Sequence, residues 1–81
     1  MLVRITERVF KELKAAPLPI QKLFRKQVSL LASNIRHPSL HVKKHDEGQD
    51  LWQARVTRDW RFYFLITGDV YLVLAMNHHP K

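Results

Sequence analysis

The sequence contains no cysteine, so neither a disulfide framework nor a thiolate metal site can form. A short chain without disulfides is typical of a reducing compartment, and we expect the protein to be cytoplasmic. The longest apolar run, residues 70–76, is far shorter than the roughly 20 residues that span a bilayer. Residues 1–10 already carry charged side chains, so we expect neither a signal peptide nor a membrane partner.

Glycine is also scarce, with only two residues, and no glycine-rich phosphate-binding loop is present. The sequence equally lacks a serine or cysteine nucleophile motif and a paired-carboxylate site. We therefore expect no cofactor, and any chemistry must come from Arg, His, Lys and Tyr side chains.

Acidic residues are outnumbered: seven Asp and Glu stand against fourteen Lys and Arg, giving a formal net charge of +7. Such a surface attracts polyanions, so nucleic acid, the ribosome or an acidic protein are the expected partners. The alternative is that the charge serves solubility alone.

With 81 residues and 46% hydrophobic residues, we expect a single folded domain over residues 1–81 rather than a disordered chain. A chain of this length buries only about 60% of the surface that its unfolded form exposes. One thin core is therefore expected.

The first half of the chain has the apolar spacing of helices. We expect a short strand over residues 2–5 and a helix from Thr6 to about Ala16. Pro17 and Pro19 then indicate a tight turn, and a second amphipathic helix should run from Ile20 until Pro38 ends it.

The second half changes to a period of two. Residues 39–49 are polar and could hold a short strand, and strands are expected over residues 52–57, 60–66 and 70–77. Gly68 supplies the positive φ of a tight hairpin. Two helices followed by an antiparallel meander predict an α+β fold, in which the helices pack on the aromatic face of a small, mainly antiparallel sheet.

The alternation also predicts a pair of arginines. If the first hairpin turns through residues 57–59, Arg55 lies directly across from Arg61, with Tyr63 on the same face. Like charges in that position destabilise a sheet by up to about 1 kcal/mol, which a bound anion would relieve. The alternative is that both arginines extend into solvent or pair with Asp50 or Asp59.

Five histidines are present, but their spacing does not predict a metal site. Pro38 keeps His37 and His41 off one helical face, and His78 and His79 point to opposite sides of a strand. A histidine beside the arginines could instead exchange a proton near neutral pH. Arginine with histidine suits RNA cleavage, in which a base deprotonates a ribose 2′-hydroxyl and an acid protonates the leaving oxygen.

The two predicted helices are followed by Leu51-Trp52-Gln53-Ala54-Arg55-Val56, then by Asp59-Trp60-Arg61, and later by the terminal His78-His79. This arrangement resembles toxins of the RelE/ParE superfamily. The pattern is most similar to the YoeB and RelE branches. The resemblance implies a RelE-like fold and the toxin of a type II toxin–antitoxin system, a ribosome-dependent endoribonuclease that cleaves mRNA and binds an acidic antitoxin. A ParE-like inhibitor of DNA gyrase and an inactive binding module remain as alternatives.

The resemblance also implies site residues. Arg55 and Arg61 would hold the scissile phosphate, and His79 would act in proton transfer. His78 is the alternative to His79, because a two-residue turn at Gly68-Asp69 would place it on the arginine face. The family's glutamate base has no counterpart here, so the base is open among the basic residues before Trp52. The expected RNA contacts are Lys43, Lys44, His41, His45, Gln53, Tyr63 and Lys81.

Overall fold

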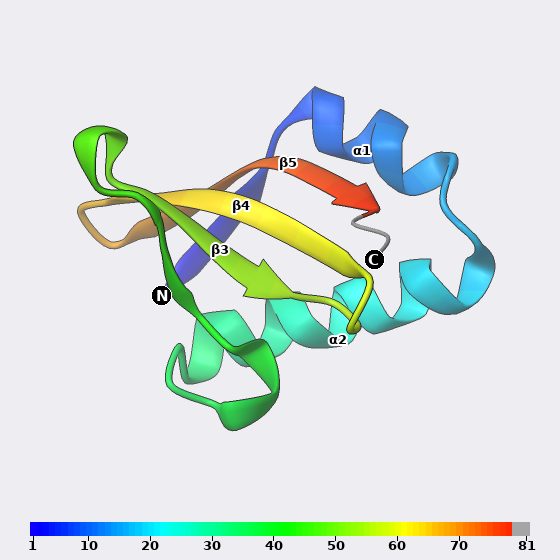
Figure 1. Ribbon diagram of the computed structural model, residues 1–81, viewed down its shortest axis with the longest axis horizontal. Helices are drawn as coiled ribbons and strands as arrows, with labels where there is room; N and C mark the ends of the chain where they lie inside the picture. The colour runs from blue at the N-terminus through cyan, green and yellow to red at the C-terminus, as the bar shows by residue number, and fades with distance from the viewer. Residues whose placement is uncertain (79–81) are drawn as a thin grey trace.

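In the computed structural model, which describes residues 1–78 apart from the side chain of Glu47, five strands form one sheet in the order β1-β5-β4-β3-β2 (Figure 1). Strands β2 to β5 pair antiparallel with their sequence neighbours, as the meander predicted, whereas β1 adds to β5 in parallel. The strands are β1 Leu2–Ile5, β2 Lys43–Asp46, β3 Leu51–Arg55, β4 Trp60–Thr67 and β5 Val70–His78.

Two α-helices accompany the sheet, α1 Glu7–Lys14 and α2 Leu18–Ser33, with short 3-10 turns η1 Pro38–Leu40 and η2 Glu47–Gln49. Helix α2 runs along one side of the sheet, and α1 lies beside the end of β5 (Figure 1). Helix α2 ends before Pro38, because Asn34 is extended and its side chain accepts a hydrogen bond from the Arg36 N–H at 3.1 Å. An Asn side chain competes with helical hydrogen bonding in this way.

The core lies between the helices and the sheet, and its largest fully buried side chains include Phe24, Phe62 and Phe64. Phe24 of α2 meets Phe62 of β4 edge to face, with ring centroids 5.4 Å apart. Burying each such side chain contributes about 1.5–3 kcal/mol. The prediction that the helices pack on the aromatic face is confirmed.

A β-bulge in β5 changes which side chains share a face. Tyr63 pairs with Ala75 and Phe64 pairs with Val73, so Leu74 has no partner in β4. A bulge inserts one residue and reverses the alternation beyond it. The hairpin between β4 and β5 turns through two residues, as expected, and Gly68 has φ 61. The bulge then shifts the pairing by one residue, so residues 60–63 do not have the partners expected from that turn.

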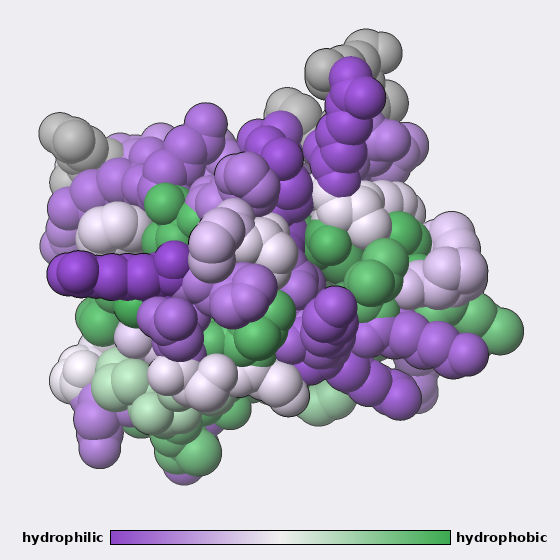
Figure 2. All heavy atoms as spheres, turned by 90° about the horizontal axis from the view of Figure 1, so that it is seen from below, coloured by the Kyte–Doolittle hydropathy of each residue, from purple (hydrophilic) through white to green (hydrophobic). Residues whose placement is uncertain are grey.

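The surface on the α2 side is mostly hydrophilic, with separate hydrophobic patches (Figure 2). The helices leave three large apolar side chains exposed: Phe10, Leu18 and Leu23. Among residues 1–78, no helix combines the length and the apolar character needed to cross a membrane.

Candidate functional site

The candidate site is centred on two arginines from adjacent strands. Arg55 ends β3 and pairs directly with Arg61 of β4, which confirms the predicted register. Both side chains are partly buried. The turn between them is held by backbone hydrogen bonds from Val56 and Thr57 to the Trp60 carbonyl oxygen, at 2.9 and 3.1 Å. The position of the pair is therefore fixed by the turn as well as by the strand ladder.

Gln27 of helix α2 connects the helix to the end of β3, and this side chain is only 5% exposed. Its Nε2 donates hydrogen bonds to the carbonyl oxygens of Arg55 at 2.8 Å and Ser39 at 3.2 Å. Gln27 was not predicted from the sequence as part of the site. The available signal was a polar side chain within an otherwise apolar helical stripe.

The two arginines are not neutralised by the described part of the protein. Salt bridges among the described side chains join Arg8 to Glu12, Lys11 to Glu7 and Lys44 to Asp50, and include neither Arg55 nor Arg61. The Nε of Arg61 is buried and has no hydrogen-bond partner within residues 1–78. An unsatisfied buried donor costs about 1–3 kcal/mol, more when charged, so an anion between the arginines would be stabilising.

These arginines line an open hollow of about 330 Å³, which we call the arginine hollow. It is large enough for a phosphodiester, and its polar lining is basic or neutral. The lining residues are His41, Val42, Lys43, Gln53, Ala54, Arg55 and Arg61.

A chain of polar contacts continues across the same face from Gln53. Its Oε1 lies 3.2 Å from His45 Nδ1, and the His45 ring packs on Tyr63 with centroids 4.8 Å apart. The Tyr63 hydroxyl in turn donates to Asn77 Oδ1 at 3.5 Å. Gln53 and Tyr63 are 7% and 8% exposed, so they support this face from within and offer RNA little surface.

A second hollow of about 290 Å³ lies at the far end of this chain of contacts. Of its lining, only His45 and Tyr63 were predicted as site residues. Asn77 was not predicted, because the bulge that brings it across from Arg61 leaves no mark in the sequence pattern. The lining residues are Arg8, His45, Leu51, Tyr63, Leu74, Ala75 and Asn77.

The expected basic residues of the loop and β2 divide between the two faces. Lys43 pairs with Gln53 and lines the arginine hollow, as does His41, which has φ 46. Lys44 pairs with Trp52 instead, and its Nζ lies 3.0 Å from Asp50 Oδ1 and 5.3 Å from the centroid of the Trp52 ring. Lys44 therefore lies on the other face from the arginine hollow, and its contact with RNA stays a prediction.

The expectation that a two-residue turn at Gly68-Asp69 would place His78 on the arginine face is wrong. His78 pairs with Trp60, and their rings pack with centroids 5.1 Å apart. The β5 bulge is the cause, since it moves Asn77 opposite Arg61. His79 and Lys81 lie outside the described residues. Within residues 1–78, no three His, Asp or Glu side chains are grouped closely enough to hold a metal ion.

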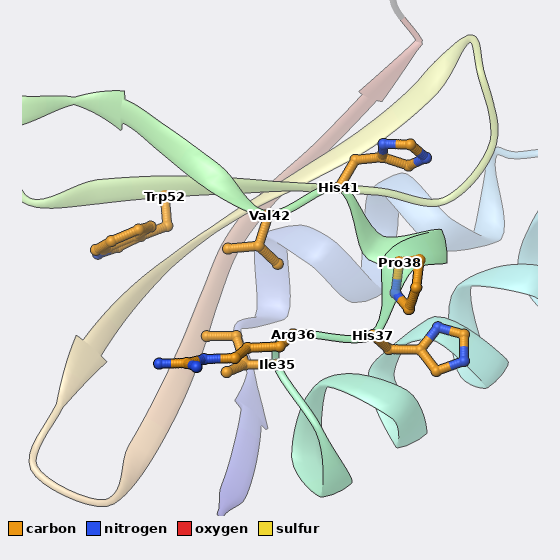
Figure 3. A pocket seen from close by; sticks show the side chains of 7 residues that line it. All are labelled: Ile35, Arg36, His37, Pro38, His41, Val42 and Trp52. Carbon is orange, nitrogen blue, oxygen red and sulfur yellow. The ribbon is translucent and has the colours of Figure 1, made fainter.

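A larger hollow of about 400 Å³ lies beneath β2, between Trp52 and the segment after α2 (Figure 3). Ile35, Val42 and Trp52 give it an apolar wall, and the Arg36 guanidinium reaches past Ile35 on the same side as Trp52 (Figure 3). His41 lines both hollows, but its imidazole points away from Arg36 (Figure 3). Neither Arg55 nor Arg61 contributes to this hollow, so its size alone does not make it the reactive site.

No protein-family model matches the sequence, and no curated protein matches it. Solved structures are similar in fold. A chain of the archaeal RelE–RelB complex from Pyrococcus horikoshii OT3 matches with a TM-score of 0.82 and 21% identity, over 99% of this chain and 96% of that chain. The isolated E. coli RelE toxin gives 0.77 and 14%, over 99% and 85%.

The YoeB–YefM toxin–antitoxin complex from Staphylococcus aureus gives a TM-score of 0.76 at 10% identity, over 99% of each chain. These similarities show that the protein has the RelE-like α+β fold. The fold that the sequence resemblance predicted is confirmed.

Proposed function

We propose that this protein is the toxin of a type II toxin–antitoxin system and an endoribonuclease that cleaves mRNA on the ribosome. The observation that supports the chemistry is the pairing of Arg55 with Arg61, whose buried Nε has no partner within residues 1–78. The RelE-like fold supports the assignment to a toxin.

In the proposed reaction the two guanidinium groups bind the scissile phosphate and stabilise the negative charge that grows on it. A general base removes the proton of the ribose 2′-hydroxyl, the 2′-oxygen bonds to phosphorus, and the bond to the 5′-oxygen breaks as that oxygen takes up a proton. The products are a 2′,3′-cyclic phosphate and a free 5′-hydroxyl. DNA, which lacks the 2′-hydroxyl, is not a substrate.

Other residues have supporting roles in this proposal. Lys43 and His41 line the arginine hollow and would contact the RNA backbone. By family resemblance, His79 transfers a proton, and Lys81 adds a phosphate contact. The net charge of +7 favours binding to ribosomal and messenger RNA.

We also propose an acidic antitoxin as partner of a single toxin domain in the cytoplasm. An apolar groove between α1 and α2 supports this, because exposed Phe10 lies in it with Leu13 and Phe24 while Lys14 and Arg25 flank it. An acidic amphipathic segment would match both features. The structures from Pyrococcus horikoshii and Staphylococcus aureus are complexes with RelB and YefM.

The test is induced expression in bacteria, followed by growth measurement and mapping of mRNA 5′ ends. The unmodified protein should arrest growth and cut mRNA, and Arg61→Ala should lower cleavage by about 100- to 1000-fold, the usual effect of removing one transition-state donor. Arg4→Ala, on exposed β1, removes the same charge far from the hollow and should leave cleavage unchanged.

Three results would contradict the proposal. Unchanged toxicity of Arg61→Ala would remove the catalytic assignment. DNA breaks that depend on gyrase, without mRNA cuts, would indicate a ParE-like inhibitor. Harmless expression in the absence of any antitoxin would indicate an inactive binding module.

A further inference from the structure

A second bulge, in β2, places His45 on the face of the arginine hollow. Lys44 pairs with Trp52 and Asp46 pairs with Leu51, so His45 has no partner in the β3 ladder. Bulges redirect a side chain and are frequent beside active sites. Here the exposed imidazole is turned toward Gln53 and Tyr63, in contact with both.

The contact with Gln53 determines which nitrogen of the neutral His45 imidazole carries the proton. Gln53 Oε1 lies 3.2 Å from His45 Nδ1, and an amide oxygen can only accept a hydrogen bond. The proton of the neutral ring is therefore on Nδ1, and Nε2 keeps its lone pair. Because Gln53 is 7% exposed and pairs with Tyr63, its amide is held in place.

His45 lines the second hollow, and its contact with Gln53 joins it to the arginine hollow on the same face of the sheet. Gln53 and Arg55 are two residues apart on β3, so their side chains share one face about 7 Å apart. Gln53 itself lines the arginine hollow. A ribose that extends past Gln53 from a phosphate held by Arg55 and Arg61 would approach the free Nε2 of His45.

We infer that His45 is the general base of the cleavage reaction and that Gln53 is its positioning residue; this inference rests on the proposed ribonuclease function. His45 Nε2 takes the proton of the 2′-hydroxyl, and the electron pair of that O–H bond stays on the 2′-oxygen as it bonds to phosphorus. The bond from phosphorus to the 5′-oxygen breaks, and that oxygen receives a proton from a general acid or from water. His45 later returns its proton to solvent.

The neighbouring basic groups fit this role less well. The ammonium of Lys43 has no lone pair to accept a proton, and Lys44 is paired with Asp50. His41 has no side-chain hydrogen bond to another residue among residues 1–78 that would orient its ring. Of these four side chains, His45 combines a ring oriented by Gln53 with a free nitrogen on the arginine face.

The test measures cleavage of ribosome-bound mRNA by the purified full chain in single turnovers across the neutral pH range. His45→Ala should lower the rate by about 100- to 10,000-fold and abolish the rise of the rate with pH on the acidic side. His37→Ala is the matched control and should cleave at the normal rate, since among the described residues the His37 side chain bonds only to Ser39 and does not line the arginine hollow.

Gln53 is tested by a pair of variants. Gln53→Leu removes the acceptor and should slow cleavage at least tenfold while binding of the ribosome stays normal. Gln53→Glu keeps an acceptor oxygen at the same position and should restore most of the rate. If His45→Ala does not fold, His45→Gln provides the same test without a large change in volume.

The outcomes separate the two proposals. If the unmodified protein does not cleave ribosome-bound mRNA, both the ribonuclease function and the role of His45 are overturned. If it cleaves and His45→Ala cleaves equally fast with the same pH profile, only the assignment of the base is overturned. A slower His45→Ala with an unchanged pH profile would likewise overturn it, since His45 would then contribute only to binding.

Discussion

The carboxylate of Glu12 in α1 accepts a hydrogen bond from the backbone N–H of Met76 in β5, at 3.1 Å. Strand β1 covers the edge of β5 only as far as Val73, so within residues 1–78 the edge beyond it has no strand partner. Just after β1, the backbone N–H of Thr6 donates a hydrogen bond to the Val73 carbonyl oxygen at 3.2 Å. Helix α1 thus stabilises the part of β5 that brings Asn77 to the arginines.

Glu12→Ala should destabilise the protein by about 1–3 kcal/mol, because the N–H of buried Met76 would lose its acceptor. Urea unfolding measures the change. Glu12→Gln keeps an acceptor oxygen and should lose less. Glu7→Ala is the control: Glu7 pairs with Lys11 on the exposed side of the same helix, and its loss should change stability by at most about 0.5 kcal/mol. Equal losses for Glu12→Ala and Glu12→Gln would contradict the role of the acceptor.

Gln27→Leu should lower the free energy of unfolding by about 1–3 kcal/mol, since it removes the donor shared by the Arg55 and Ser39 carbonyl oxygens. It should also lower mRNA cleavage, because the end of β3 loses its attachment to α2. Chemical unfolding and single-turnover cleavage measure the two effects. Lys26→Leu, at the exposed neighbouring position, should change stability by no more than about 0.5 kcal/mol. Normal cleavage by a destabilised Gln27→Leu would show that the attachment does not position Arg55.

The pairing of Arg55 with Arg61 could be predicted because the core residues of β3 and β4 recur at every second position, with Gln53, Arg55 and Arg61 between them. Trp52, Ala54 and Phe62 allow only one register that keeps the aromatic residues on one face, and the structure has that register. Where the side-chain period is two, a shift of one residue would expose the whole core face.

The two bulges could not be predicted from the same rule. Strand β5 is apolar on both faces around Leu74, so inserting one residue there leaves no visible break in the pattern. Strand β2 is polar on both faces, so its alternation gives no indication of how His45 points. Both bulges lie next to the candidate site, where they determine that His45 and Asn77, and not His78, share the arginine face.

His78→Ala should leave mRNA cleavage within about twofold of normal, because the His78 ring packs on Trp60 away from the arginine hollow. Loss of that ring contact should cost about 0.5–1.5 kcal/mol of stability. Asn77→Ala is the comparison: Asn77 faces Arg61 and accepts from the Tyr63 hydroxyl, so this variant should cleave more slowly. A large loss of cleavage in His78→Ala, with Asn77→Ala normal, would restore His78 to the site.

Arg55→Gln should lower mRNA cleavage strongly and yet leave the protein as stable as before, or more stable by up to about 1 kcal/mol. The variant removes the repulsion between two cations that face each other across the sheet. Urea unfolding at low salt measures the gain, which should shrink at high salt because ions screen such a pair. Arg58→Gln removes the same charge from the exposed turn and should change neither property. If Arg55→Gln were instead clearly less stable at low salt, the packing of the Arg55 stem would outweigh the repulsion. The stability that the Arg55 stem contributes would then be enough to explain why the two arginines lie opposite each other, without a role in binding an anion.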